Sequence, residues 1–158
     1  MNITWVTSFP NGQEQGRYLT LDLGGTNLRV CEVGLSTQKG DFETTQRKFQ
    51  LPSHLRSAPA SELWDYAAEC VRLFMHEHHQ GGQNSDKVPL AFTFSYPVEQ
   101  TSIKSGFLQH WTKGFKCPDA EGKDVVCELE KALEKKVCPC SSSPFTELSI
   151  FFRKCQSV

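Results

Sequence analysis

The sequence predicts an α/β fold in which a three-stranded antiparallel meander is followed by helices and a further strand. Short segments that alternate apolar and polar residues, separated by brief turns, occupy the first third of the chain, as is typical of antiparallel strands. Later in the chain, apolar residues recur at helical spacing in two segments, with a buried-strand pattern between them. The 158 residues match the length of one ordinary domain.

The three meander strands are expected at residues 18–23, 28–33 and 42–51. Apolar and polar side chains alternate in residues 28–33, which is the period of a half-buried strand. Pro52 ends the third strand, because proline has no backbone N–H to continue a ladder. The connections are short, which favours antiparallel pairing.

A long helix is expected between Pro59 and the two glycines at 81–82, because proline is favoured at helix starts and glycine at helix ends. Its expected buried face consists of residues that recur at helical spacing: Leu63, Tyr66, Ala67, Cys70, Leu73 and Phe74. Residues 88–94 are a short apolar run that indicates a buried strand, and residues 98–122 are expected to be mainly loop. Asp124 can cap a second helix.

Composition excludes several classes of function. The 17 basic and 18 acidic residues give a net charge of −1, so no excess of positive charge exists to hold a nucleic-acid backbone. The mean hydropathy is −0.43, and no apolar run approaches the ~20 residues that a membrane span needs. Residues 1–6 lack the pattern of a secretory signal. The seven cysteines have no regular spacing, so we expect reduced thiols in a cytoplasmic protein.

The most informative segment is the turn between the first two strands, Asp22–Arg29 (DLGGTNLR). Its two adjacent glycines let backbone amides approach a ligand that side chains would exclude. The turn carries groups suited to phosphate oxygens and to Mg²⁺: Asp22, Gly24, Gly25, Thr26, Asn27 and Arg29. Asp22, at the strand end, is the candidate that would hold Mg²⁺ through water. An ordinary glycine hairpin is the alternative interpretation.

A second informative segment begins at residues 90–97 (LAFTFSYP), where the buried strand opens into a loop. Ser95 lies at that opening, which is the usual place for a ligand contact in an α/β fold. Thr112 and Lys113 follow in a region with an aromatic cluster: Phe107, Trp111 and Phe115. Hydroxyl-rich ligands are held by such polar groups over apolar surface. The alternative is a hydroxyl that caps its own strand and a solvated loop lysine.

Together these segments resemble the hexokinase family, and the fungal enzymes most of all. Asp22–Arg29 is similar to the family's first phosphate motif, and Leu90–Phe115 is similar to its sugar-binding signature almost from end to end. Thr44–Lys48 (TTQRK) and Gly122–Val126 (GKDVV) also fit, as does the order of all four segments. The resemblance covers about residues 3–136.

The resemblance implies an actin-like ATPase fold of the ribonuclease H-like type, with two lobes that close over a hexose and MgATP. The family transfers the γ-phosphoryl group of ATP to the sugar 6-hydroxyl, and closure excludes water. Ser95, Thr112 and Lys113 match positions that hydrogen-bond a glucose-like hexose. The glycine turn matches the turn around the ATP phosphates, and Lys48 matches a lysine credited with nucleotide contact.

The chain also departs from the family. The family's general base is the aspartate of an Asn-Asp-Thr-x-Gly-Thr segment that would follow shortly after Lys136, and residues 137–158 contain neither Asn nor Asp. The second phosphate motif, the adenosine site and the later sugar-binding glutamates belong to a large lobe that is missing here. We therefore interpret residues 1–136 as a small-lobe fragment without its catalytic base, and residues 137–158 as an aberrant tail, disordered or frameshifted.

The tail has a specific explanation in the genetic code. Cys138-Pro139-Cys140 is what the family's Val-Pro-Val becomes one base out of register. A frameshift, a misplaced intron boundary or a pseudogene would each produce such a tail, and the genomic and transcript sequence across Lys136 would decide. Without a partner sheet, the β-prone residues 145–152 would promote aggregation.

Two metal sites are weaker interpretations. A zinc site in the tail would use Cys138, Cys140 and Cys155, but structural zinc needs four ligands. The histidines near the end of the long helix more simply form a solvated helix terminus: His76, His78 and His79.

We therefore predict a chain derived from an ATP-dependent hexokinase, with a hexose and MgATP as its ligands, that does not itself catalyse phosphoryl transfer. The first alternative is a non-catalytic hexose-binding, nucleotide-binding or regulatory fragment that acts on the full-length kinase. The second is an unstable product of a broken gene.

Overall fold

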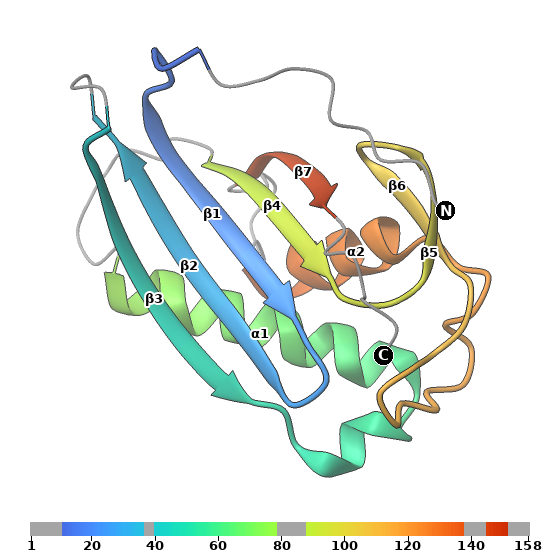
Figure 1. The fold of residues 1–158 in the computed structure, drawn as a ribbon. Helices are drawn as coiled ribbons and strands as arrows, with labels where there is room; N and C mark the ends of the chain where they lie inside the picture. Colours follow the sequence, from blue (N-terminus) through green and yellow to red (C-terminus); the bar gives the residue numbers. More distant parts are fainter. Residues whose placement is uncertain (1–10, 37–39, 79–87, 138–144, 152–158) are drawn as a thin grey trace.

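The computed structural model describes residues 11–36, 40–78, 88–137 and 145–151. At its centre is a five-stranded sheet. The strands, in their order across the sheet, are β3 (Phe42–Gln50), β2 (Asn27–Leu35), β1 (Gly16–Leu23), β4 (Val88–Phe94) and β7 (Phe145–Phe151). Two helices, α1 (Ala60–His78) and α2 (Val125–Val137), lie across the same face of this sheet (Figure 1).

The predicted antiparallel meander is confirmed. β1 pairs with β2 from Gly16 opposite Leu35 to Leu23 opposite Leu28, and β2 pairs antiparallel with β3. β1 begins at Gly16 instead of the predicted residue 18, and β2 runs from Asn27 to Leu35 instead of over 28–33. The short turn at residues 24–26 places the two strands side by side, so pairing continues up to the turn itself.

The sheet continues beyond the meander through parallel strands. After β3 the chain passes through the short 3-10 helix η1 (Ser53–Arg56) and then α1 before it returns as β4. β4 pairs parallel with β1, and Leu90 lies opposite Leu19. The predicted buried strand at residues 88–94 is therefore confirmed, and it occupies an interior position of the sheet.

Part of the predicted aberrant tail belongs to this sheet. β7 pairs parallel with β4, and Leu148 lies opposite Leu90. Phe145–Phe151 therefore have a partner strand, β4, while the interpretation of residues 137–158 as an aberrant tail stays a prediction. The three tail cysteines and their alternative zinc site lie outside the described residues. The frameshift hypothesis concerns the gene and stays a prediction.

The apolar core lies between the sheet and the two helices. Alternate residues of the central strands point into it and are at most 2% exposed: Leu19, Leu21, Leu23, Leu28, Val30, Leu90, Phe92 and Phe94. The predicted buried face of α1 is confirmed at Leu63, Ala67, Cys70 and Phe74. Tyr66 and Leu73 are only half-buried, whereas other α1 residues are buried: Ala60, Trp64, Ala68 and Val71.

This wider buried face has a structural cause. α1 packs against α2 as well as against the sheet, so its buried face is wider than a single apolar stripe. Within the described part of the chain, no helix is both long and apolar enough to cross a membrane.

Asp124 caps α2 as predicted. Its Oδ1 accepts hydrogen bonds from Val126 N at 3.0 Å and from Gly106 N at 3.2 Å. Its Oδ2 accepts from Ser105 Oγ at 2.6 Å. One carboxylate therefore ties the start of α2 to a neighbouring hairpin, and Asp124 replaces the backbone partners that the first helical amides lack.

That hairpin corrects the prediction that residues 98–122 are mainly loop. β5 (Val98–Ser102) and β6 (Ser105–Leu108) form an antiparallel two-stranded sheet. Only Val98 and Leu108 among its apolar side chains are buried. Because most residues of these short strands are polar or glycine, the apolar periodicity that marks a strand is weak here.

Candidate functional site

The glycine turn and the segment around Ser95 meet at the carboxyl ends of strands β1 and β4. Residues 24–26 connect β1 to β2, and β4 ends with Phe94 opposite Leu23, the last residue of β1. Ser95 N donates to the Leu23 carbonyl oxygen at 3.4 Å. The parallel pairing of β1 and β4 therefore brings together two predicted site segments that are far apart in the sequence.

Internal hydrogen bonds hold the glycine turn. Gly24 N donates to the Asn27 carbonyl oxygen at 3.0 Å, and Asn27 Nδ2 donates to Thr26 Oγ1 at 2.7 Å. Leu51 N donates to the Thr26 carbonyl oxygen at 3.0 Å, which anchors the turn to the chain that leaves β3. The amide and hydroxyl groups predicted to face phosphate oxygens thus lie on a fixed turn.

The loop that carries Thr112 and Lys113 packs directly on this turn. A Cβ atom added to Gly25 would lie 3.2 Å from Lys113 Cδ and 3.3 Å from Lys113 Cβ. A Cβ added to Gly24 would meet only the Asn27 carbonyl oxygen, at 3.4 Å. The second glycine is therefore the one whose missing side chain leaves room for the lysine. We call the contact region of residues 24–27, 95–96 and 111–115 the turn–loop junction.

Lys113 is held from two sides. Its Nζ donates to the Ser95 carbonyl oxygen at 2.7 Å and lies 5.1 Å from the centre of the Tyr96 ring. Its backbone φ is 56°, in the left-handed region that a non-glycine residue adopts only when its surroundings hold it there. The structure thus brings Ser95 and Lys113 into contact, as their assignment to one site requires.

Thr112 stands out by what its side chain lacks. Its Oγ1 is buried and has no hydrogen-bond partner. A buried hydroxyl without a partner costs about 1–3 kcal/mol, so a ligand hydroxyl that pairs with it would remove that cost. Of the three predicted sugar-binding residues, Thr112 is the one whose side chain has a buried oxygen without a hydrogen-bond partner.

Aromatic rings support the loop. Trp111 stacks on Phe115 at 5.2 Å between ring centres, and both meet the Tyr96 ring edge-on, at 5.0 and 5.3 Å. Trp111 Nε1 donates to the Cys117 carbonyl oxygen at 3.0 Å. The predicted aromatic cluster is wrong for Phe107, which is 39% exposed because it occupies an outward position of β6.

Tyr96 contacts the predicted site residues but was not itself among them. Its hydroxyl donates to the Gly24 carbonyl oxygen at 2.9 Å, while its ring lies under Lys113. One signal could have found it, because a buried tyrosine usually places its hydroxyl on a hydrogen-bond partner. The identity of that partner depends on strand pairing and was not readable from the sequence.

The remaining predicted nucleotide residues form a row across the sheet. Asp22 lies opposite Arg29 on β2, and Arg29 lies opposite Lys48 on β3. Arg29 Nη1 is 4.0 Å from Asp22 Oδ2, and Asp22 Oδ1 is buried without a hydrogen-bond partner. Lys48 is exposed two strand spacings away, at about 10 Å. Lys48 is therefore in line with Asp22 but is not part of the turn–loop junction.

A magnesium ion fits this arrangement only through Asp22. Among the residues that the structure describes, no three His, Cys, Asp or Glu side chains gather as a metal-binding group. Mg²⁺ is commonly held by one or two carboxylates together with water and substrate phosphates, so the buried Asp22 Oδ1 would suffice. His76 and His78 are exposed at the end of α1, and His79 lies outside the described residues.

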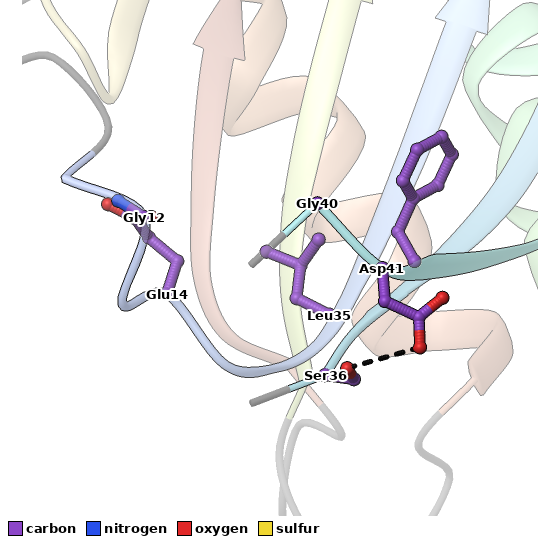
Figure 2. A pocket seen from close by; sticks show the side chains of 7 residues that line it. Gly12, Glu14, Leu35, Ser36, Gly40 and Asp41 are labelled. Carbon is purple, nitrogen blue, oxygen red and sulfur yellow. Dashed lines mark hydrogen bonds between the residues drawn. The ribbon is translucent and has the colours of Figure 1, made fainter. Parts of the chain in front are cut away.

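A separate hollow lies at the opposite end of the same strands. Figure 2 shows Gly12, Glu14, Leu35, Ser36, Gly40 and Asp41 around it, with Ser36 Oγ bonded to Asp41 Oδ2 at 3.4 Å. Hydrogen bonds from backbone amides, that of Asn11 first, lower the pKa of the Glu14 carboxyl. None of the predicted site residues lines this hollow.

Comparisons with known sequences identify relatives. A family model described as "Hexokinase" matches residues 1–145. Hexokinase of Emericella nidulans is 50% identical over 139 residues, which are 88% of this chain and 28% of that protein. Hexokinase-1 of Saccharomyces cerevisiae is 47% identical over 136 residues, which are 85% of this chain and 28% of that protein. The chain thus spans less than a third of the length of these relatives.

Solved structures agree with the sequence comparison. A hexokinase from Schistosoma mansoni complexed with glucose has a TM-score of 0.84 and 33% identity, and the match covers 96% of this chain and 32% of that chain. A second hexokinase crystal structure has a TM-score of 0.73 and 30% identity. Residues 1–136 alone cannot supply a 96% share, so part of the predicted tail takes part in the likeness. These matches confirm the predicted fold class.

Proposed function

This chain belongs to the hexokinase family, and from that premise we propose that it is a small-lobe part that binds a hexose and the phosphates of MgATP at the turn–loop junction. The family reaction that this site serves is transfer of a phosphoryl group from ATP to the hexose 6-hydroxyl. When bound, MgATP supplies the phosphoryl group and the metal charge. The chain's own residues bind and orient the two ligands.

The observation that carries the hexose assignment is the buried Thr112 Oγ1 without a partner, beside Lys113 and the glycine turn. A sugar hydroxyl is both donor and acceptor, so it can satisfy the threonine hydroxyl whichever way that group points. The rings of Trp111 and Phe115 supply the apolar surface over which hydroxyl-rich ligands are held. The glucose complex of the Schistosoma mansoni hexokinase supports the choice of a glucose-like hexose.

The nucleotide assignment rests on the residues around β1. The turn amides and the Thr26 hydroxyl suit phosphate oxygens, and the buried Asp22 Oδ1 suits a magnesium-bound water. Arg29 and Lys48 continue from Asp22 as a row of positive charge across β2 and β3. Such a row suits an extended polyphosphate better than a single phosphate group.

We propose further that this chain does not itself transfer the phosphoryl group. The family's aspartate base belongs to an Asn-Asp-Thr segment, and residues 137–158 contain neither Asn nor Asp. Without a base beside the attacking hydroxyl, general-base catalysis of typically 10²–10⁴-fold is lost. We therefore assign residues 1–136 a ligand-binding role and interpret residues 137–158 as a segment of altered sequence, of which Phe145–Phe151 complete the sheet.

Calorimetry tests the binding proposal. Glucose titrated into the purified chain should bind with a millimolar dissociation constant. Thr112→Val keeps the side-chain shape but removes the hydroxyl, and should weaken glucose binding about tenfold. Thr44→Val makes the same change on an exposed residue of β3 and should leave binding unchanged. Absence of binding heat at millimolar glucose would reject the hexose assignment.

A coupled phosphorylation assay tests the catalytic proposal. We expect no turnover of glucose with MgATP above that of a variant carrying Thr112→Val and Lys113→Ala together. Turnover that this double variant abolishes would show that the chain is an active kinase.

The described cysteines support a cytoplasmic location, which we propose here. Cys31, Cys70, Cys117 and Cys127 are free in the structure. Burial raises the pKa of the Cys70 thiol to about 11, and burial also raises the pKa of the Cys117 thiol, so both stay protonated and unreactive. Structural disulfides persist mainly in oxidising compartments, so free thiols agree with a reducing one. Fractionation of cells that express the chain tests this location.

A further inference from the structure

Tyr96 contacts the glycine turn through its hydroxyl. The hydroxyl donates to the Gly24 carbonyl oxygen at 2.9 Å, and Gly24 N donates to the Asn27 carbonyl oxygen. Hydrogen bonds therefore hold Gly24 through both its amide N–H and its carbonyl oxygen. A shift of the Tyr96 hydroxyl would change the orientation of the first glycine, whose neighbours are proposed to face the nucleotide phosphates.

The same side chain contacts the Lys113 loop through its ring. The Lys113 ammonium lies 5.1 Å from the ring centre, and the Trp111 and Phe115 rings stand roughly perpendicular to the Tyr96 ring with their centres 5.0 and 5.3 Å from its centre. Tyr96 is only 4% exposed, so its ring is enclosed by these neighbours and by Phe94. The ring therefore cannot move without displacing the loop.

Two further contacts close the connection. Lys113 Nζ donates to the carbonyl oxygen of Ser95, the residue before Tyr96. The Lys113 side chain also occupies the space beside Gly25. The glycine turn, Tyr96 and the Lys113 loop are thus in mutual contact, because each of the three contacts the other two.

We propose that Tyr96 is a positioning residue that couples the glycine turn to the Lys113 loop, so that order in one segment imposes order in the other. This inference rests on the proposed function only for its ligands, a hexose at the loop and nucleotide phosphates at the turn. A ligand that orders one segment then lowers the cost of ordering the other. Bound hexose therefore raises the affinity for nucleotide, and bound nucleotide raises the affinity for hexose by the same factor.

Tyr96→Phe is the sharpest test, because it removes the hydroxyl bond to the turn and keeps the ring that supports the loop. Amide hydrogen exchange is followed at Gly24 N, in the turn, and at Phe115 N, which donates to the Thr112 carbonyl oxygen in the loop. We expect exchange about fivefold faster at both amides. Faster exchange at Gly24 alone would overturn the coupling, because the loop would then be indifferent to the turn.

Tyr18→Phe is the matched control. The Tyr18 hydroxyl donates to the Gln15 carbonyl oxygen at 3.2 Å, at the other end of β1. It should leave exchange at Gly24 and Phe115 within twofold of the parent. Lys113→Ala supplies a reciprocal variant that enters from the loop side and should speed exchange at Gly24. Unchanged exchange at Gly24 in Lys113→Ala would also overturn the coupling.

Ligand titrations separate this inference from the proposed function. In the parent chain, saturating glucose should tighten MgATP binding about fivefold, and the gain should vanish in Tyr96→Phe. Equal gains in the parent and in Tyr96→Phe would overturn the role of the hydroxyl. If the parent binds neither ligand, the proposed function fails, and the exchange measurements still decide whether Tyr96 couples the two segments.

Discussion

The apolar core and the turn–loop junction are held together in different ways. In the core, Leu21, Leu23, Phe74 and Phe92 are fully buried, and apolar packing fixes their positions. At the junction, hydrogen bonds and one ammonium–ring contact hold Lys113 at a left-handed backbone angle, and Thr112 Oγ1 stays unpaired. The core is built for stability, whereas the junction keeps local strain and an unpaired hydroxyl that a ligand can relieve.

The largest expected effect breaks the core side of this comparison. Phe74→Ala removes a fully buried ring from α1 and should lower the free energy of unfolding by about 3–5 kcal/mol. Phe42→Ala is the matched control, because Phe42 is 62% exposed and its loss should change stability by no more than about 0.5 kcal/mol. Urea unfolding measures both variants. Equal losses for the two phenylalanines would show that the core is not where the stability lies.

A smaller effect addresses the junction through its two glycines. Gly25→Ala places a Cβ within 3.2 Å of Lys113, and should lower the free energy of unfolding by about 1 kcal/mol and glucose affinity about tenfold. Gly24→Ala meets one atom at an ordinary distance and should leave glucose affinity within about twofold. Unfolding and calorimetry of both variants measure these changes. A loss of affinity equal in both variants would remove the argument that Lys113 needs the space at Gly25.

The smallest effect is a pH dependence of the core. Burial raises the pKa of the Cys70 thiol to about 11, so the folded chain keeps this proton more tightly than the unfolded chain. The contribution of the protonated Cys70 thiol to the free energy of unfolding is complete at pH values below the ordinary thiol pKa, and it is lost as the pH rises toward 11. By pH 9.5 the loss should be less than about 1 kcal/mol.

Unfolding curves between pH 7 and pH 9.5 measure this loss. Cys70→Ala should remove that part of the pH dependence, and Cys127→Ala, on an exposed cysteine, should retain it. An unchanged pH profile in Cys70→Ala would contradict the assignment of the effect to this thiol.

Most of the fold was predictable because its signals are local. Alternation in residues 28–33, Pro52 and the helix signals around Pro59 and Asp124 each act within a few residues. The predictions failed where the apolar pattern is weak or where strands far apart in the sequence pair. The hairpin at 98–108 carries little apolar periodicity, and β7 pairs with β4, a strand far earlier in the sequence.

The candidate site divides in the same way. The motifs predicted the candidate residues Ser95, Thr112 and Lys113 and the candidate glycine turn. The contact between Ser95 and Lys113, and the bond from the Tyr96 hydroxyl to the turn, depend on the parallel pairing of β1 with β4. The Tyr96 hydroxyl bonds a carbonyl 72 residues earlier, and no local pattern encodes such a partner.

The parallel pairing of β1 with β4 also determines the order in which parts of the chain can fold during synthesis. The meander joins neighbours in sequence, so it needs only short loop closures and can form once residues up to Gln50 have left the ribosome. The glycine turn is then complete while Ser95 and Lys113 are still to be synthesised. Because α1 lies between the two parallel strands in sequence, the junction closes only after the long crossover is in place. Glucose affinity in chains stalled at increasing lengths would therefore report the closure of the junction, before α2 and β7 have been added.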